Sequence, residues 1–191
     1  MRIKALTLAL FVGVAVVGCG DASEQQPASE TPAETAAPAA GLTDADWFVV
    51  DHDAQTVEID LVAGQSSQNN YWNYNGAFGG AGQVTVPAGY EVTINLENQD
   101  PNMAHSVGVG EQQASYPANF SAAEPVFEGA VTENPTSLTE STLPGETESI
   151  TFVADAAGDY VLICYVTGHA VAGMWVPFTV SADGEAGVSG F

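Results

Sequence analysis

The chain has 191 residues and a one-sided charge: 24 aspartate and glutamate residues against two basic residues, Arg2 and Lys4, give a formal net charge of −22. Because no lysine or arginine follows residue 4, the body of the chain has no cations to neutralise phosphates, which excludes nucleic acid as a partner. The acidic residues are spread along the chain, and we interpret this as a halophilic adaptation to concentrated salt rather than as a match to one basic partner.

The first 18 residues have the composition of an export signal. A basic start, Met1 to Lys4, precedes an apolar run of 13 residues, Ala5 to Val17, which is too short to span a bilayer. The run ends in Val16-Val17-Gly18-Cys19, which looks like a lipobox, so we expect Cys19 to be lipidated and to become the first residue of the mature protein. The alternative is an ordinary signal peptide followed by an incidental cysteine.

Composition divides the rest of the chain into three parts. Residues 19–41 are rich in alanine, proline and glutamate and have almost no large apolar side chain, so we expect a disordered tether. Residues 42–182 are expected to form one domain of ordinary size, and residues 183–191 a flexible tail. With Cys19 lipidated, Cys164 has no disulfide partner in the domain, so metal binding, catalysis or burial must account for it.

Short runs of strand-forming residues, separated by turn residues, predict an all-β fold. In chain order, the predicted strands are 46–50, 56–61, 69–76, 83–86, 91–96, 103–109, 148–153, 159–163 and 175–180. The first turn contains His52, which we interpret as a solvated histidine rather than an accessory metal ligand. The aromatic run at 69–76 is expected to pack its side chains in the core.

One long segment, residues 110–145, has no regular pattern. Four prolines interrupt it, and only Pro125 to Phe127 suggests a short edge strand. A segment of this length either carries function or packs on the domain as a lid. Together, the short strands, the frequent turns and the lack of helical periodicity after the signal predict an antiparallel β-sandwich.

The loop between the last two predicted strands carries three metal-binding residue types, Cys164, His169 and Met174, at spacings of five and five. A thiolate, two imidazoles and a distant thioether suit copper in a trigonal electron-transfer site. The second imidazole has to come from elsewhere, and we expect His105, which lies 59 residues before Cys164, to supply it. Met103 is a rival thioether that we place at the surface near the site.

The order of these four candidate ligands resembles that of cupredoxins, and of sulfocyanin and rusticyanin in particular. The supporting motifs are Trp72-Asn73-Tyr74-Asn75-Gly76, Val86-Pro87-Ala88-Gly89-Tyr90-Glu91-Val92, His105-Ser106, Ala156-Ala157-Gly158-Asp159-Tyr160 and Gly168-His169-Ala170-Val171-Ala172-Gly173-Met174-Trp175. The resemblance implies a monomeric Greek-key sandwich of about eight strands that holds one type 1 copper ion through His105, Cys164, His169 and Met174. It also implies single-electron carriage in a respiratory chain outside the cytoplasmic membrane.

Two positions depart from the family pattern. Thr167 stands where proline is usual before the glycine and histidine of the loop, which could loosen the loop without removing a ligand. Ser106 follows the first histidine, as in rusticyanin, where many other cupredoxins have asparagine. The hydrogen bonding that holds the thiolate loop is therefore open at this point.

We expect the partners to be membrane-bound or soluble redox proteins, such as a cytochrome or a terminal oxidase. They would dock on an apolar patch around His169, whose imidazole edge is expected to reach solvent among small residues such as Ala170 and Val171. A lipid on Cys19 would be the sole attachment to the membrane and would hold the protein on its outer face. A dry shell that includes Trp72 and Tyr74 is expected to favour Cu(I).

The alternatives are a copper store or chaperone and, less favoured, a copper-dependent oxidoreductase. An oxidoreductase of this fold needs further histidines for a second copper site, and only His52 is unassigned. A cysteine–histidine hydrolase would need an activated thiolate and a third group to orient the base, and it has no use for Met174. We therefore expect an electron carrier and not an enzyme.

Overall fold

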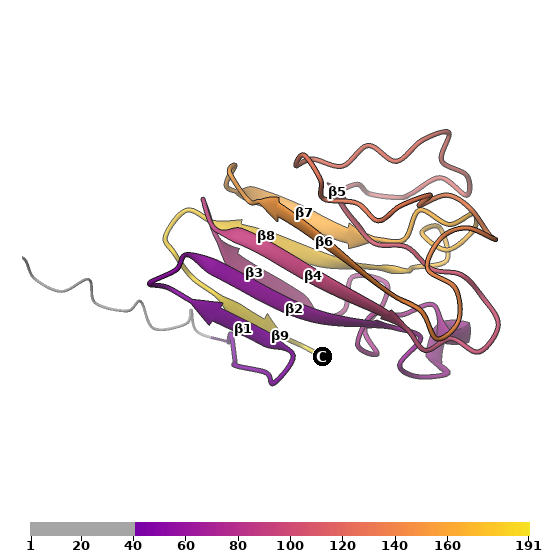
Figure 1. Ribbon diagram of the computed structural model, residues 1–191, viewed down its shortest axis with the longest axis horizontal. Coiled ribbons are helices and arrows are strands. Elements are labelled where there is room, and N and C mark those ends of the chain that lie inside the picture. Colours follow the sequence, from indigo (N-terminus) through magenta and orange to yellow (C-terminus); the bar gives the residue numbers. More distant parts are fainter. Residues whose placement is uncertain (1–40) are drawn as a thin grey trace, which may run out of the picture. The chain divides into compact units, whose positions relative to one another are not determined.

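Nine short strands make up the sheets of residues 41–191, the part of the chain that the computed structural model describes (Figure 1). They are β1 (Phe48–Asp51), β2 (Thr56–Ala63), β3 (Gln83–Pro87), β4 (Glu91–Asn98), β5 (Gly108–Glu111), β6 (Thr147–Val153), β7 (Gly158–Ile163), β8 (Trp175–Ser181) and β9 (Gly187–Ser189). A short 3₁₀ segment, η1 (Gln68–Tyr71), lies between β2 and β3. The predicted export signal, the lipidation site at Cys19 and the tether up to residue 40 lie outside the described residues.

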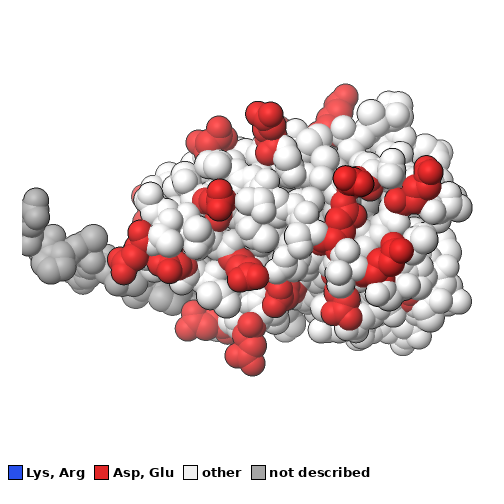
Figure 2. All heavy atoms as spheres, viewed as in Figure 1, with Lys and Arg blue, Asp and Glu red and all other residues white. Residues whose placement is uncertain are grey.

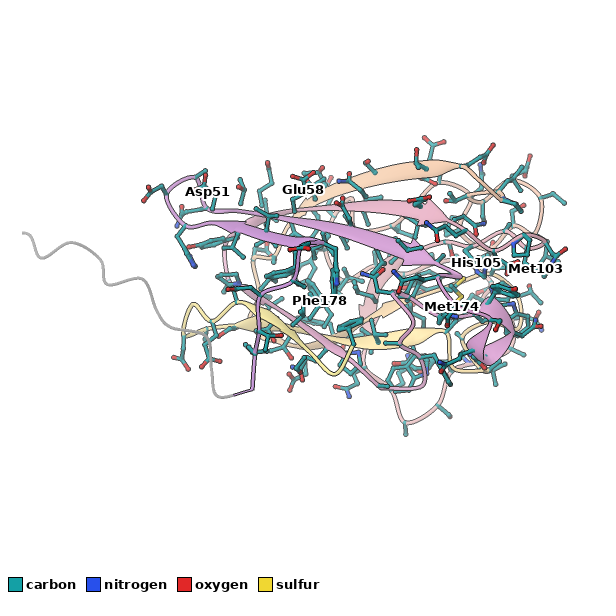
Figure 3. All side chains as sticks on the ribbon, turned by 90° about the horizontal axis from the view of Figure 1, so that it is seen from below. Asp51, Glu58, Met103, His105, Met174 and Phe178 are labelled. Atoms are coloured by element: carbon teal, nitrogen blue, oxygen red, sulfur yellow. The ribbon has the colours of Figure 1, made fainter. Side chains whose placement is uncertain are left out.

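The strands form two facing layers, so the predicted β-sandwich is confirmed, although its strand pairs are not all antiparallel as expected (Figure 3). One sheet has the strand order β1-β2-β4-β6 and the other β5-β7-β8-β3-β9. Both sheets are mixed, because β2 pairs with β4 and β3 pairs with β8 in parallel, whereas the remaining pairs are antiparallel. The parallel pairing of β2 and β4 follows from the path of the chain, which crosses to the other sheet as β3 before it returns.

The core lies between the two sheets and follows the alternation seen in the sequence. In β2 the inward residues Val57, Ile59 and Leu61 are buried, and the polar residues between them are exposed. The strand β4 has the same pattern. Each of these side chains removes enough apolar surface from water to contribute ~1.5–3 kcal/mol to folding, so the sandwich is a rigid support for the loops at its ends. In residues 41–191 no helix is both long and apolar enough to cross a membrane.

The predicted strand at 69–76 is wrong. Asn69, Asn70 and Tyr71 have φ values of 48°, 57° and 66°, in the left-handed region that asparagine tolerates better than most residues. The side-chain amide of Asn73 donates to two backbone carbonyls of the preceding turn at 2.8 and 2.9 Å, which holds the segment in a coil. Local side-chain to backbone bonds of this kind compete with pairing in a sheet.

The last residues of the chain are not the flexible tail that the sequence suggested. Residues 187–189 form β9, which pairs with β3 so that Ser189 lies opposite Gln83. The ring of Phe191 packs edge-on against Trp47 with centroids 4.8 Å apart. The domain therefore extends beyond its expected end at Ala182.

Between β5 and β6 the chain runs irregularly, and it packs onto the sandwich instead of standing away from it. The predicted edge strand at 125–127 does not form, since only one backbone bond, from Val126 N–H to the carbonyl of Val109, joins it to β5. Phe127 is buried and stacks on Phe152 of β6 with centroids 5.6 Å apart. The sequence left open whether this segment carries function or packs on the domain as a lid. The structure shows that it packs on the domain.

Candidate metal centre

The loop that carries Cys164, His169 and Met174 joins β7 to β8 at one end of the sandwich. Figure 3 shows His105, Met103 and Met174 at this end and Asp51, in the β1–β2 turn, at the other. Cys164 directly follows β7 and Met174 directly precedes β8, and the N–H of Cys164 donates to the carbonyl of Met174 at 3.1 Å. The antiparallel pair of strands therefore closes the loop at its base.

Two further backbone bonds fold the loop inward. The N–H of His169 donates to Val166 at 3.1 Å, and the N–H of Met174 donates to the carbonyl of His169 at 2.9 Å. Gly168 has a φ of 87°, which a larger residue would adopt only under strain, and its N–H donates to Ala118 at 2.7 Å. These bonds place the imidazole of His169 over the thiol of Cys164.

His105 reaches the same point from a distant part of the chain. It lies three residues before β5 rather than at the start of a strand as expected, and its N–H donates to the carbonyl of Thr142 at 3.0 Å. The irregular segment between β5 and β6 thus positions a candidate ligand as well as covering the sandwich.

The three candidate ligand atoms converge in the interior. Nδ1 of His169 lies 3.2 Å from Nδ1 of His105 and 3.4 Å from Sγ of Cys164. The three ligand atoms lie within 4.8 Å of one another, and all three side chains have an exposed fraction of 0%. The structure brings together the cysteine and both histidines that the sequence singled out.

The two methionines and His52 differ in burial. Met174 is fully buried in the core cluster that contains Cys164, whereas Met103 is partly exposed. His52 is exposed in the β1–β2 turn, where its Nδ1 lies 3.0 Å from the hydroxyl of Tyr90. It takes no part in the cluster of Cys164 and the two other histidines, in agreement with its interpretation as a solvated residue.

Ser106 supplies the hydrogen bonding that the sequence left open. Its N–H and its hydroxyl lie 3.5 and 3.6 Å from Sγ of Cys164, and its hydroxyl oxygen accepts the N–H of Tyr165 at 3.0 Å. The hydroxyl of Tyr74 donates to the carbonyl of Ser106. Of the shell residues expected from the sequence, Tyr74 thus supports the site through Ser106.

Burial controls the protonation of the three side chains. It raises the pKa of the Cys164 thiol, and the hydrogen bonds from Ser106 act in the opposite direction. Burial, together with the neighbouring His105, lowers the pKa of His169 to about 3. Burial also lowers the pKa of His105, although Asp100 opposes that shift. Both imidazoles are therefore held in the neutral form that binds metals.

His169 does not reach solvent, so the expectation that its edge is exposed is wrong. The indole of Trp72 stacks on its ring with centroids 4.2 Å apart and an interplanar angle of 21°. The coil that contains Trp72 is tied to the loop by bonds from Asn69 to the carbonyl of Ala172 at 3.1 Å and from Gly79 to Gly173 at 2.7 Å. The coil that replaced the predicted strand is therefore the cover of the site.

Asp100 belongs to the site, although the sequence did not indicate it. One carboxylate oxygen lies 3.0 Å from Nε2 of His105, and the residue is 2% exposed. In the sequence it is one acid among many in a polar loop, and only the fold shows that this one points inward.

The three side chains fit a single metal ion. With nitrogen at about 2.0 Å and sulfur at about 2.3 Å from a metal, trigonal geometry separates two nitrogens by about 3.5 Å and nitrogen from sulfur by about 3.7 Å. The observed separations of 3.2 and 3.4 Å need only a small outward shift to reach these values. Nε2 of His105 is occupied by Asp100, which leaves Nδ1 to face the cluster. A thiol with two imidazoles is a donor set that suits copper.

Comparison with known proteins agrees with this geometry. Residues 45–187 match the family model of the Sulfocyanin (SoxE) domain. The chain is similar to Sulfocyanin of Sulfolobus acidocaldarius, with 28% identity over 131 residues that cover 66% of this chain and 64% of the relative. It is also similar to Auracyanin-A of Chloroflexus aurantiacus, with 37% identity over 93 residues that cover 46% of this chain and 57% of the relative. The matches thus span less than two thirds of each relative.

Two solved structures are also similar to this chain. Rusticyanin from Thiobacillus ferrooxidans has a TM-score of 0.48 and 20% identity, over 71% of this chain and 87% of that one. Auracyanin A from Chloroflexus aurantiacus, described as a "blue" copper protein, has a TM-score of 0.44 and 24% identity, over 66% of this chain and 98% of that one.

A β-sandwich whose loops gather one cysteine and two histidines at one end defines a cupredoxin, the class of blue copper electron-transfer proteins. Since the family model covers most of its length, the chain belongs to the sulfocyanin family within that class. The cofactor of the family is one copper ion, and the cluster of His105, Cys164 and His169 is positioned to hold it.

Proposed function

We propose that this protein is a type 1 copper electron carrier in which His105, Cys164 and His169 would hold the ion and Met174 would supply a weaker thioether ligand. The observation that carries the proposal is the convergence of the three ligand atoms within 4.8 Å in a fully buried site. The burial of Met174 beside Cys164 in the same loop supports its role. When bound, copper in this donor set would alternate between Cu(I) and Cu(II) and so carry one electron.

The protein supplies a rigid and dry site. Bonds within the loop and across its base hold Cys164 and Met174 in place, and Thr142 holds His105. Because the ligands come from packed elements, we expect little rearrangement when an electron is gained or lost. Trp72 and its coil exclude water, which favours a carrier over a store or chaperone, since a store needs ligands that exchange readily.

The place of this carrier in the cell is a further part of the proposal. We propose that the chain is exported, that a lipid on Cys19 anchors it to the outer face of the cytoplasmic membrane, and that it is a monomer there. Its partners would be a cytochrome or a terminal oxidase of a respiratory chain. The signal-like start of the sequence and the membership in the sulfocyanin family support this assignment. We also propose that the protein turns over no substrate of its own.

Copper titration of the full chain tests the electron-carrier function. The copper-loaded protein should show an intense blue or green band that ascorbate bleaches, and voltammetry should show a reversible one-electron couple. Cys164→Ser should lose the band, whereas Cys19→Ser, which removes the other cysteine of the chain, should keep it. A colourless copper-loaded wild type, or a band that survives Cys164→Ser, would refute the proposal.

The anchor is tested separately. Cys19→Ala should move the protein from the membrane fraction to the soluble fraction of the cell envelope and should leave the visible spectrum unchanged. If the variant stays with the membranes, the lipid on Cys19 is not the attachment.

A further inference from the structure

Asp100 is a buried carboxylate in a domain that has no lysine or arginine to pair with it. The residue is 2% exposed, and no basic residue follows Lys4 in the sequence. Burying a carboxylate is costly unless hydrogen bonds and a nearby positive charge compensate for the lost hydration. Among residues 41–191, only a histidine or a bound cation could provide that charge.

Its contacts show that the carboxylate is held in a fixed orientation. Oδ1 accepts the N–H of Asn102 at 2.8 Å and the N–H of Met103 at 3.2 Å, while Oδ2 lies 3.0 Å from Nε2 of His105. The N–H of Asp100 itself donates to the side chain of Asn98 at 2.9 Å. The turn therefore aims Oδ2 at the outer nitrogen of the imidazole, on the side of the ring away from the cluster.

We propose that Asp100 is a positioning residue that fixes His105 with Nδ1 unprotonated and facing the cluster, and that its charge lowers the reduction potential of the bound copper. This inference rests on the proposed electron-carrier function. A neutral imidazole has one proton, so a ring that donates Nε2–H to a carboxylate presents a lone pair at Nδ1. Asp100 thereby selects the tautomer that can bind a metal.

The expected effect on the reduction potential of bound copper follows from the negative charge of Asp100. A carboxylate one imidazole ring away from the copper stabilises the more positive Cu(II) state relative to Cu(I), and the buried surroundings strengthen this interaction. The dry cover provided by Trp72 acts in the opposite direction, because it favours the less charged Cu(I) state. Asp100 therefore offsets part of the rise in potential that burial produces.

The variant Asp100→Asn tests whether the charge of Asp100 lowers the reduction potential of the copper. Asparagine keeps the size of the side chain and an oxygen for the N–H groups of Asn102 and Met103, but it removes the charge and turns its NH₂ group toward Nε2–H of His105. Copper affinity should therefore fall as well, and the potential is compared at saturating copper. The potential measured by voltammetry should rise while the visible band persists. The control Glu97→Gln removes the same charge from an exposed position on β4. Its shift should be at most about a quarter as large, because the effective dielectric constant is about 80 in water and about 20 near buried sites, and because Asp100 contacts His105 whereas Glu97 does not.

Equal shifts of the reduction potential in the two variants, or no shift in Asp100→Asn with an intact visible band, would overturn the proposed effect of the Asp100 charge.

A second measurement needs neither a variant nor copper: ¹⁵N NMR of the imidazoles in the metal-free wild type should show His105 with its proton on Nε2. A proton on Nδ1 would overturn the positioning role even if Asp100→Asn fails to fold. If the copper-loaded wild type has no blue band, the proposed function fails, and the NMR result still decides the tautomer.

Discussion

At the residue scale, His169 shows how complete burial prepares an imidazole to bind a metal. The ring lies between Trp72 and His105 and has no exposed surface. Protonation there would place a charge in an apolar space beside a second imidazole, which is why the pKa of His169 falls to about 3. The lone pairs that a metal needs are therefore available even in mildly acidic solution.

This burial predicts that the metal-free protein loses stability as the pH falls from about 6.5, the ordinary pKa of histidine. The unfolded chain takes up a proton on His169 near that pH, whereas the folded protein does so only near a pKa of about 3. Between these values the unfolded state binds more protons, so acid favours unfolding, by about 1.4 kcal/mol per pH unit for one histidine. Urea unfolding of the metal-free protein at several pH values measures the slope.

The variant His169→Gln is the control, because it removes the titrating ring while the acidic residues and His105 stay in place. Its stability should fall less steeply with acid than that of the wild type. Parallel slopes in the two proteins would contradict the depressed pKa of His169.

At the element scale, hydrogen bonds join the β7–β8 loop to the coil at 68–80. The loop supplies Cys164, His169 and Met174, and the coil covers His169 with Trp72. The large apolar side chain that remains accessible in the middle of the loop is Val171, which is 56% exposed and is followed by the exposed Ala172. If partners dock at this end of the sandwich, they meet Val171 and the partly exposed Trp72 rather than the imidazole itself.

The substitution Val171→Asp should therefore slow electron exchange with a redox partner and leave the visible spectrum unchanged. The decrease should be at least about tenfold, because burying one valine contributes ~1.5 kcal/mol or more and a carboxylate would have to be desolvated in its place. Stopped-flow mixing with an oxidised partner measures the rate. Val49→Asp is a matched control, since Val49 is 55% exposed on β1. Equal rates in the two variants would contradict docking on the loop.

The sequence predicts the elements that depend on local patterns. The strands around Val57 and Val92 alternate cleanly and were predicted correctly. Cys164 and His169 lie in one loop, and the structure brings them together as their spacing indicated. The coil at 69–76 was missed because aromatic residues favour strands, and the positive φ values of its asparagines depend on local hydrogen bonds that composition does not reveal. The three-residue strand β9 has too few residues to produce a pattern.

The features of the site that the sequence did not predict have a different cause, because they depend on contacts between distant segments. Trp72 covers a histidine 97 positions later, and Asp100 is buried because the turn after β4 folds back onto His105. No single stretch of sequence records either contact. The exposure of His169 was therefore predicted from its small neighbours in the loop, and it failed because the cover comes from another part of the chain.

At the scale of the whole molecule, the surface of residues 41–191 is acidic and has no lysine or arginine to balance its carboxylates. Figure 2 shows aspartate and glutamate side chains scattered over one face of the domain and no lysine or arginine there. The sequence has no basic residue after Lys4, so mutual repulsion between the carboxylates destabilises the folded state at low salt. The cluster of His105, Cys164 and His169 is buried and takes no part in this repulsion.

We therefore expect the melting temperature of the protein to rise when sodium chloride is increased from 0.1 to 1 M, since the Debye length falls from about 10 to about 3 Å over this range. Differential scanning calorimetry of the reduced, copper-loaded protein measures the shift. Chloride is preferred to sulfate, because sulfate strengthens apolar burial in any protein. A melting temperature that is constant or falls over this range would contradict the proposed adaptation to salt.

One copper ion bound between His105 and the β7–β8 loop, two segments that are far apart in the sequence and meet at one end of the sandwich, is the central claim. Anomalous diffraction at the copper absorption edge, from crystals of the copper-loaded protein, tests this directly. We predict one strong peak enclosed by Nδ1 of His105, Nδ1 of His169 and Sγ of Cys164, with the sulfur of Met174 as the next nearest donor. A strong peak elsewhere, or no peak within reach of Cys164, would contradict the account.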